Sequence, residues 1–345
     1  MAKWENDSDL AIIQALQLPP GKLKVVLDSD AYNETDDQFE ITWALCHEER
    51  LDIQGFYAAP FLNGRSESPA DGMLKSYHEI AKLLKLAGFD QKFPIKQGAK
   101  SFLTKADDAQ PSEAVDHLIE TAFALTDEKL YVVATGALTN VASAIIKEPR
   151  IIDRIVVIWL GGQPFYWPSA FEFNLSQDKL AVNIVLDSKV PLVLVPAMSV
   201  ASDLKTTPLE IDHYLLETSD VGDYLARLTR TFLTQILEKG DRGLTKIAKD
   251  KNPYLRGQND LDVSQFKPIN SPIAKGKIVW DLAPLAFLIN PLWTTSRLVS
   301  APQVTAEDTW VFPENRHPIR VVTHVNRDGI FGDLFNRVSK LPKTN

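Results

Sequence analysis

The sequence predicts an α/β protein built on an open, mostly parallel, doubly wound (Rossmann-like) sheet, with a helical insertion and C-terminal edge strands. Apolar runs rich in β-branched residues alternate repeatedly with helical patterns along the chain. The runs are almost continuously apolar, which is typical of parallel strands covered on both faces. No repeat, low-complexity tract or linker interrupts this alternation, so we expect one domain over residues 1–345.

The first half of the chain alternates strands with helices. Asp71, Ser112 and Thr139 each stand where a helix N-cap is expected, because short polar side chains there accept free backbone N–H groups of the first turn. Gly88 is expected to end the helix that follows Asp71. Strands are predicted at 23–28, 51–59, 129–135, 154–160 and 191–196, and helices at 36–49, 71–86, 112–126, 139–147 and 177–187.

The second half begins with the predicted helical insertion, at about 200–270. Its patterns are helical and loop-like, and residues 221–239 form an amphipathic stretch. Residues 281–290 predict an apolar helix. The runs at 309–312 and 319–325 then predict one or two edge strands before a closing helix.

Composition narrows the classes of function. The chain has 345 residues, 45% of them hydrophobic, and its net charge is −8, which argues against nucleic-acid or membrane partners. The single cysteine, Cys46, excludes intrachain disulfides and a cysteine-built zinc site. Neither an apolar run of transmembrane length nor a signal-peptide pattern is present, so we expect a cytoplasmic protein that acts on a small molecule.

The strongest chemical signal follows the first predicted strand, in VVLDSDAYNETDD. Asp28, Asp30, Asp36 and Asp37 flank one short loop that also contains Glu34. Like charges this close repel unless a cation or a shared proton compensates them, and a hard cation with oxygen ligands is the simplest remedy. EF-hand spacing and nearby His or Cys are missing, which leaves magnesium or calcium. The alternative is a capped helix preceded by a solvated acidic loop.

The same DxD also resembles the start of the haloacid-dehalogenase phosphatases. In that interpretation Asp28 is the nucleophile of a magnesium-dependent phosphatase. That family has Thr or Val two residues after the second Asp, and this chain has Tyr32 there. The phosphatase therefore stays an alternative.

Two later segments also place polar residues after predicted strands. Glu172 and Asn174 are separated by one residue, so in an extended chain they point the same way, within a loop rich in aromatic residues. A carboxylate and an amide among aromatic rings suit a sugar, whereas the alternative is a loop folded over its own aromatic cluster. Asp281 opens the apolar helix at 281–290, where by itself it is expected to be an N-cap.

Together these segments resemble the calcium-dependent nucleoside hydrolase family, the inosine-uridine preferring N-ribohydrolases. DSDAYNETDD is similar to the family's opening DxDxxxDD motif, with two extra residues in the loop. TGALTN (135–140), the GG…EFN segment (161–174) and the Trp280-Asp281 pair follow in the family's order. The resemblance covers about residues 24–290 and marks the chain as a divergent member.

The resemblance implies an enzyme that uses Ca2+ to hydrolyse the N-glycosidic bond of ribonucleosides, releasing base and ribose. Asp30 would be a calcium ligand and the general base for the attacking water. The family also forms homodimers and homotetramers. The further implied ligands are Asp37, the Thr135 carbonyl and Asp281; the implied sugar-binding residues are Asp36, Glu172, Asn174 and Asn63; and Asp28 would support them.

Three departures from the family pattern concern the substrate. Trp280 stands where some members carry the His that protonates the leaving base, and an aromatic ring there can instead stack on the base. Tyr166 replaces an Asn, and the first loop is longer. The leaving group is therefore open, and another riboside or furanoside, or a non-catalytic calcium-dependent sugar binder, stays an alternative.

Overall fold

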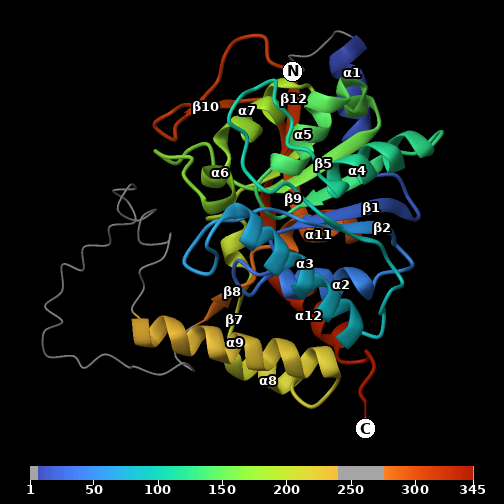
Figure 1. Ribbon diagram of the computed structural model, residues 1–345, viewed down its shortest axis with the longest axis vertical. Coiled ribbons are helices and arrows are strands. Elements are labelled where there is room, and N and C mark those ends of the chain that lie inside the picture. Colours follow the sequence, from blue (N-terminus) through green and yellow to red (C-terminus); the bar gives the residue numbers. More distant parts are fainter. Residues whose placement is uncertain (1–6, 240–275, 345) are drawn as a thin grey trace, which may run out of the picture.

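An eight-stranded sheet forms the centre of the computed structural model, which describes residues 7–239 and 276–344 (Figure 1). All neighbouring strands are parallel except β9, which runs antiparallel to β12 at one edge. In spatial order the strands are β3 (Ile95–Gln97), β2 (Leu51–Ala58), β1 (Leu23–Ser29), β4 (Leu130–Ala134), β5 (Ile155–Leu160), β6 (Leu192–Val195), β12 (Pro318–Val325) and β9 (Thr294–Ser300).

The order of the strands reverses at β1. The chain adds β2 and β3 on one side of β1, then crosses to add β4, β5 and β6 on the other. Asp28, near the end of β1, pairs with Tyr57 of β2 and Ala134 of β4. Ligands of open α/β sheets bind outside the carboxyl ends of the strands at such a reversal. The acidic segment after β1 therefore lies where this fold places a site.

Helices cover both faces of the sheet and bury two hydrophobic clusters (Figure 1). The first cluster includes Phe39 and Trp43, and the second includes Trp159, all fully buried. Over the first lie α2 (Asp37–Leu45), α3 (Pro69–Leu86), α8 (Pro208–Leu215), α9 (Asp220–Lys239), α11 (Leu282–Ile289) and α12 (Arg327–Val338); over the second lie α4 (Glu113–Ala124), α5 (Thr139–Lys147) and α7 (Lys179–Asp187).

Shorter elements connect these layers. The helix α1 (Asp7–Ala15) packs against β12, and its Ile12 joins the first cluster. The others are α6 (Phe173–Gln177), the paired strands β7 (Lys205–Thr206) and β8 (Lys277–Ile278), the hairpin of β10 (Gln303–Val304) and β11 (Trp310–Val311), and the 3-10 turns η1 (Pro149–Asp153), η2 (Ala201–Asp203) and η5 (Pro291–Trp293).

The predicted α/β class and the five predicted N-terminal strands are confirmed. The prediction for the C-terminal strands was partly wrong: β12 is an interior strand, because β9 pairs along its outer side. The predicted insertion contains α8 and α9, and its remainder, from residue 240 to about 270, lies outside the described residues.

Two predicted helix caps differ from the structure. The cap of α3 is Ser68 rather than Asp71, because Pro69 fits the first helical position and the Ser68 hydroxyl accepts the backbone N–H of Asp71 at 3.1 Å. Thr139 is the first residue of α5 and caps nothing. Its hydroxyl donates instead to Oδ2 of Asp178 at 2.7 Å.

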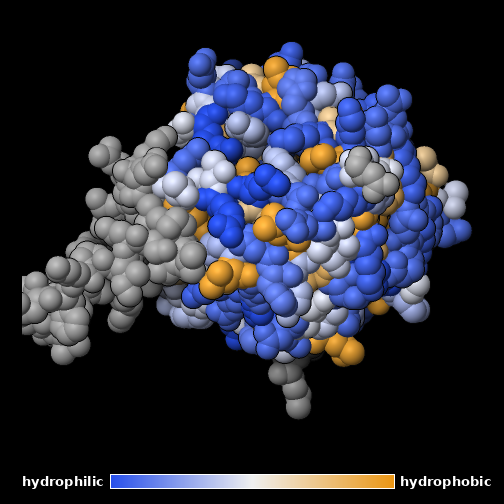
Figure 2. All heavy atoms as spheres, turned by 90° about the horizontal axis from the view of Figure 1, so that it is seen from below, coloured by the Kyte–Doolittle hydropathy of each residue, from blue (hydrophilic) through white to orange (hydrophobic). Residues whose placement is uncertain are grey.

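The surface gives one further observation. Figure 2 shows the face seen from below, on which hydrophilic side chains predominate and apolar ones lie scattered among them. Among the helices that the structure describes, none is long and apolar enough to cross a membrane.

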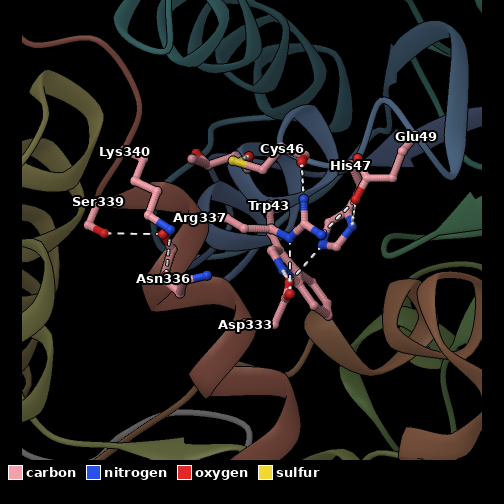
Figure 3. A network of polar contacts seen from close by, with 10 residues as sticks. Trp43, Cys46, His47, Glu49, Asp333, Asn336, Arg337, Ser339 and Lys340 are labelled. Carbon is pink, nitrogen blue, oxygen red and sulfur yellow. Dashed lines mark hydrogen bonds and ion pairs between the residues drawn. The ribbon is translucent and has the colours of Figure 1, made fainter.

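A polar network fixes the C-terminal end of α2 against α12 (Figure 3). Oδ1 of Asp333 accepts the indole N–H of Trp43 and lies 2.8 Å from Nε2 of His47. The Arg337 guanidinium donates to Oδ2 of Asp333 at 2.9 Å and to the Cys46 carbonyl at 2.8 Å. Because α2 begins in the acidic segment, this network holds the far end of a helix that carries site residues.

We expect the Asp333 carboxylate to stabilise the fold above about pH 4. Burial by itself raises the pKa of Asp333, but hydrogen bonds from His47, Trp43 and Arg337 outweigh it and lower the pKa from 3.8 to about 2. A depressed carboxyl pKa contributes stability that is lost as the pH falls through that window.

Asp333→Asn should therefore lower the free energy of unfolding at pH 7 by about 1–3 kcal/mol, and that deficit should shrink between pH 4 and pH 2. Urea unfolding at several pH values measures it. Asp328→Asn, at a 90% exposed side chain, is the matched control. A deficit that stays constant down to pH 2 would contradict the assignment.

Candidate metal and substrate site

The acidic side chains come together at the carboxyl edge of the sheet. Asp30 follows β1, Asp36 and Asp37 begin α2, and Asp281 directly precedes α11. The sequence brings them there because β1 and the start of both helices meet at the strand reversal. All are almost fully buried, with exposures of 1% for Asp30, 3% for Asp36, 1% for Asp37 and 4% for Asp281.

Three of these carboxylates form a cluster that could hold a metal ion. Asp36, Asp37 and Asp281 each offer one oxygen, and these oxygens lie within 4.8 Å of one another. Asp281 stands at the N-cap position of α11 but makes no side-chain capping hydrogen bond. Its carboxylate therefore belongs to the cluster rather than to the helix terminus, which favours the functional interpretation over the plain cap.

Asp30 lies beside this cluster with two free oxygens. Within the described residues, neither Oδ1 nor Oδ2 of Asp30 has a hydrogen-bond partner, although both are buried. Burial, then the charges of Asp37 and Asp36, raise the pKa of Asp30 well above its ordinary value, and the nearby Asn33 amide partly offsets them. Orphaned buried carboxylate oxygens beside three other carboxylates are what a hard cation would satisfy.

Asp37 is oriented by two hydroxyl groups. Oδ1 of Asp37 accepts a hydrogen bond from Ser29 at 2.6 Å and a longer one from the Thr135 hydroxyl at 3.4 Å. Burial raises the pKa of Asp37 to about 6, while the Ser29 hydrogen bond lowers it. These contacts fix the orientation of the Asp37 carboxylate.

The sequence analysis missed Glu40, which lies one helical turn after Asp37. Glu40 is fully buried; its Oε2 accepts the Thr135 hydroxyl at 3.1 Å, and its Oε1 has no partner among the described residues. Burial and then the charge of Asp37 raise its pKa. The spacing of three between Asp37 and Glu40 puts both on one helix face and was the available signal.

Asp28 lies within β1, two residues before Asp30, and its hydrogen bonds support the site. Its Oδ1 accepts the Asn140 amide at 2.8 Å, and Asn140 also accepts the backbone N–H of Ala99. Burial raises the pKa of Asp28 to about 7. Asn140, the last residue of the TGALTN motif, thus links β1 to the start of α5.

The Glu172 to Asn174 segment is not extended, so that part of the sequence interpretation was wrong. Phe173 begins α6, and Glu172 caps this helix by accepting the backbone N–H groups of Asn174 and Leu175, together with that of Gly162. Burial raises the pKa of Glu172 to about 7. Its charge also acts on Asp30, so it lies near the cluster.

Asn174 contacts the predicted calcium-ligating carbonyl. Its Nδ2 donates to the Thr135 carbonyl at 3.1 Å and to the Leu160 carbonyl at 3.0 Å. Asn174 therefore ties the end of β4 to the end of β5. The Thr135 carbonyl keeps a second lone pair, so a metal ligand role for it stays compatible with this contact.

The three remaining predicted substrate-binding residues, Asn63, Trp280 and Tyr166, differ in burial and in contacts. Asn63 donates to Oδ1 of Asn33 at 2.5 Å, which joins the second loop to the loop of Asp30. Trp280 is half-buried and packs against the first hydrophobic cluster. The structure does not bring Tyr166 into the cluster, because its side chain is 75% exposed. In the same loop, Phe165 packs edge-on against Trp310 and Phe312.

Lys277 is the second residue that the sequence analysis missed. Its side chain is 3% exposed, and Nζ lies 3.2 Å from Oε1 of Glu34 and 3.6 Å from Oδ2 of Asp36. Burial by itself lowers the pKa of Lys277, but Asp36 and Glu34 outweigh it and raise the pKa. Burial raises the pKa of Asp36 to about 8, with Lys277 opposing the shift. A buried ammonium thus faces the acidic cluster.

The fold and the site define a class: a doubly wound α/β protein with a buried carboxylate cluster at its strand reversal that could hold a metal ion. The model of the inosine-uridine preferring nucleoside hydrolases matches residues 25–332. The chain belongs to this family, as its motifs predicted.

Individual relatives share the sequence locally and the fold globally. A putative pyrimidine-specific ribonucleoside hydrolase, RihB, of Shigella boydii serotype 4 (strain Sb227) is 36% identical over 91 residues, which cover 25% of this chain and 37% of the relative. The match therefore spans little more than a third of that relative's length.

Among solved structures, a plant nucleoside hydrolase, PpNRh1, has a TM-score of 0.68 at 20% identity, over 93% of this chain and 99% of that chain. A purine-preferring ribonucleoside hydrolase from Gardnerella vaginalis has a TM-score of 0.68 at 19% identity, over 92% of this chain and 98% of that chain. At such identities the likeness shows the fold.

Proposed function

We propose that the protein hydrolyses the N-glycosidic bond of ribonucleosides, releasing base and ribose, with a bound Ca2+. The observation that carries the proposal is the pair of orphaned, buried Asp30 oxygens beside the Asp36, Asp37 and Asp281 cluster. Membership of the nucleoside hydrolase family supports the reaction, and the all-oxygen donor set supports a hard cation.

In this proposal Asp30, Asp37, Asp281 and the Thr135 carbonyl hold the cation. When bound, the cation would lower the pKa of a water and grip vicinal sugar hydroxyls. Asp36 accepts a ribose hydroxyl, while Asn174 fixes the Thr135 carbonyl through its 3.1 Å hydrogen bond. Glu172 fixes α6 at the rim, and its partly buried carboxylate adds negative charge near Asp30.

Asp30 acts as the general base. Its free oxygens can take a proton from the water that attacks the anomeric carbon, because no protein donor occupies them within the described residues. Bond cleavage leaves positive charge on the ribosyl ring, as in other glycoside hydrolysis. The fixed carboxylates around the ring stabilise that charge most strongly in the transition state.

In this proposal the base departs with the electron pair of the N-glycosidic bond, takes its proton from water and faces a tryptophan rather than an acid. Trp280 directly precedes the proposed ligand Asp281 and is half-buried, and we assign its ring to stacking on the base. Asn63 is held by its contact with Asn33 in the loop of Asp30, and we assign it to the sugar. Tyr166, being 75% exposed, would contact substrate only at the rim.

Trp280→Ala should lower kcat/KM for nucleosides by roughly 5- to 150-fold, since stacking a base on an aromatic ring contributes about 1–3 kcal/mol. Trp280→Phe, which keeps a stacking ring, should retain most of the activity. Steady-state kinetics on both variants decide the matter. An alanine variant within threefold of the unmodified protein would remove Trp280 from the base site.

A panel of purine and pyrimidine ribonucleosides tests the reaction. We expect free ribose to accumulate with calcium, and its release to stop when a chelator is added. If ribose binds in a calcium-dependent way but no nucleoside or other furanoside is cleaved, the protein is a sugar binder.

The phosphatase alternative has its own assay. It requires Asp28 to reach a substrate, yet Asp28 lies within β1 and its Oδ1 accepts the Asn140 amide. Magnesium-dependent cleavage of p-nitrophenyl phosphate that Asp28→Asn abolishes would support it over the nucleosidase. We expect no such cleavage.

A further inference from the structure

A buried cation already stands at the acidic site, and it comes from the chain itself. The Lys277 ammonium lies 3.2 Å from Oε1 of Glu34 and 3.6 Å from Oδ2 of Asp36, and it donates to the Ile278 carbonyl at 2.5 Å. Its side chain is 3% exposed, so solvent screens these pairs little. Burying an ammonium is costly unless it is paired, and here both partners are carboxylates of the first loop.

Asp36 is the member of the cluster that Lys277 contacts. One Asp36 oxygen lies within 4.8 Å of oxygens of both Asp37 and Asp281, so by distance alone Asp36 qualifies as a metal ligand. Among these three residues, the ammonium lies within ion-pair distance of Asp36. The ammonium offsets part of the negative charge of Asp36 and repels a nearby divalent ion. Asp36 is therefore the poorest metal ligand of the three carboxylates.

We propose that Lys277 is a positioning residue that keeps Asp36 out of the metal's coordination and available to a substrate hydroxyl. This inference rests on the proposed function and deepens it, because it explains why one of three adjacent carboxylates serves the sugar. Glu34, in the lengthened first loop, is the second acceptor that fixes the ammonium beside Asp36.

Without the ammonium, Asp36 becomes an additional cation ligand. Lys277→Met, which keeps an unbranched side chain one atom shorter and removes the charge, should bind Ca2+ roughly 10-fold more tightly. The same variant should show a KM for nucleosides raised roughly 10-fold or more, because Asp36 no longer accepts the sugar. A purely structural lysine would weaken both functions together, so opposite changes in the two constants distinguish the roles.

Calorimetric titration with calcium measures the first change and needs no turnover. Lys277→Arg, which keeps the charge, should bind calcium within about threefold of the unmodified protein. Lys24→Met is the matched control: this lysine pairs with Asp52 at 2.5 Å, and its side chain is 28% exposed. Lys24 lies at the amino end of β1, opposite the site, so its replacement should change neither constant.

A double-mutant cycle shows whether Lys277 acts through Asp36. In an Asp36→Asn background, the gain in calcium affinity from Lys277→Met should shrink at least threefold. A gain of equal size in both backgrounds would overturn the inference, as would Lys277→Met binding calcium no more tightly than the unmodified protein.

If Lys277→Met does not fold, Glu34→Gln carries the test. Without the Glu34 charge, the Lys277 ammonium pairs with Asp36 alone. Calcium affinity should therefore fall about threefold or more. This fall should be absent in the Asp36→Asn background. Unchanged affinity would overturn the inference. Failure of the proposed function is distinguishable from failure of this inference. In that case the unmodified protein would leave nucleosides intact, while the calorimetric titrations would still measure the calcium affinities of the variants.

Discussion

Asp30→Asn should lower kcat for ribose release by roughly 10²- to 10⁴-fold, the usual contribution of a general base. An amide keeps the size of the side chain and an oxygen that can ligate a cation, although more weakly than a carboxylate, and it cannot take a proton from water, so kcat is compared at saturating calcium. Both oxygens of Asp30 are free of protein donors within the described residues, so the substitution breaks no hydrogen bond that the structure shows. Steady-state assay of ribose release measures the loss.

Thermal stability separates loss of chemistry from loss of fold. Asp30→Asn removes one charge from a cluster of like charges, so in the absence of calcium the variant should melt at or above the temperature of the unmodified protein. Asp328→Asn, the same exchange at an exposed side chain, should leave kcat unchanged. Ribose release by Asp30→Asn within tenfold of the unmodified rate would assign the base to another residue.

Asp281→Asn should abolish calcium-dependent activity through loss of the ion. Replacing a ligating carboxylate should weaken calcium binding by roughly 100-fold or more, since even residues behind the ligands contribute 10- to 100-fold. The stability of the calcium-free protein should change in the opposite direction and increase. Burial and the charges of Asp36 and Asp37 raise the pKa of Asp281, so replacing this carboxylate removes repulsion and should stabilise the calcium-free fold.

Thermal melting with and without calcium measures both effects. The unmodified protein should gain about 2.7 kcal/mol at a calcium concentration 100 times the Kd, and Asp281→Asn should gain much less. Asn290→Asp, which places a carboxylate at the opposite end of α11, offers a matched control and should leave calcium affinity unchanged. Equal stabilisation of Asp281→Asn and the unmodified protein by calcium would remove Asp281 from the ligands.

Much of this site follows from the sequence because strand ends are easy to locate. The apolar run before Asp28 predicts β1, and the parallel order then places Asp30, Asp36 and Asp37 at one sheet edge. Asp281 joins them from more than 240 residues further along the chain (281 − 37 = 244). The family motifs, rather than periodicity, pointed to that long-range contact.

Other features depend on tertiary contacts that a sequence pattern does not contain. Glu40 has the spacing of an ordinary helical residue, and only its contact with Thr135 reveals its burial in the site. Lys277 precedes the motif residue Asp281 by four positions, but its partner Glu34 lies in a distant loop. The segment from Glu172 to Asn174 was expected to be extended, but Phe173 and Asn174 are helical and Glu172, itself extended, caps their helix.

The edge strands show the same limit. β3 has three residues, too few to display a period, and it exists through pairing with β2. β9 alternates half-buried and exposed residues in its first part, and its pairing with β12 makes the latter an interior strand. The pairing of such a strand depends on the strands that lie beside it in the fold. Its register therefore cannot be derived from the residues of the edge strand alone.

A crystal structure of the protein grown with calcium tests the central claim most directly. We predict one ion per chain in the acidic cluster, with oxygens of Asp30, Asp37, Asp281 and the Thr135 carbonyl as ligands and Asp36 turned toward Lys277. Activity that persists in chelator, together with a map that shows no ion among these four residues, would contradict the account.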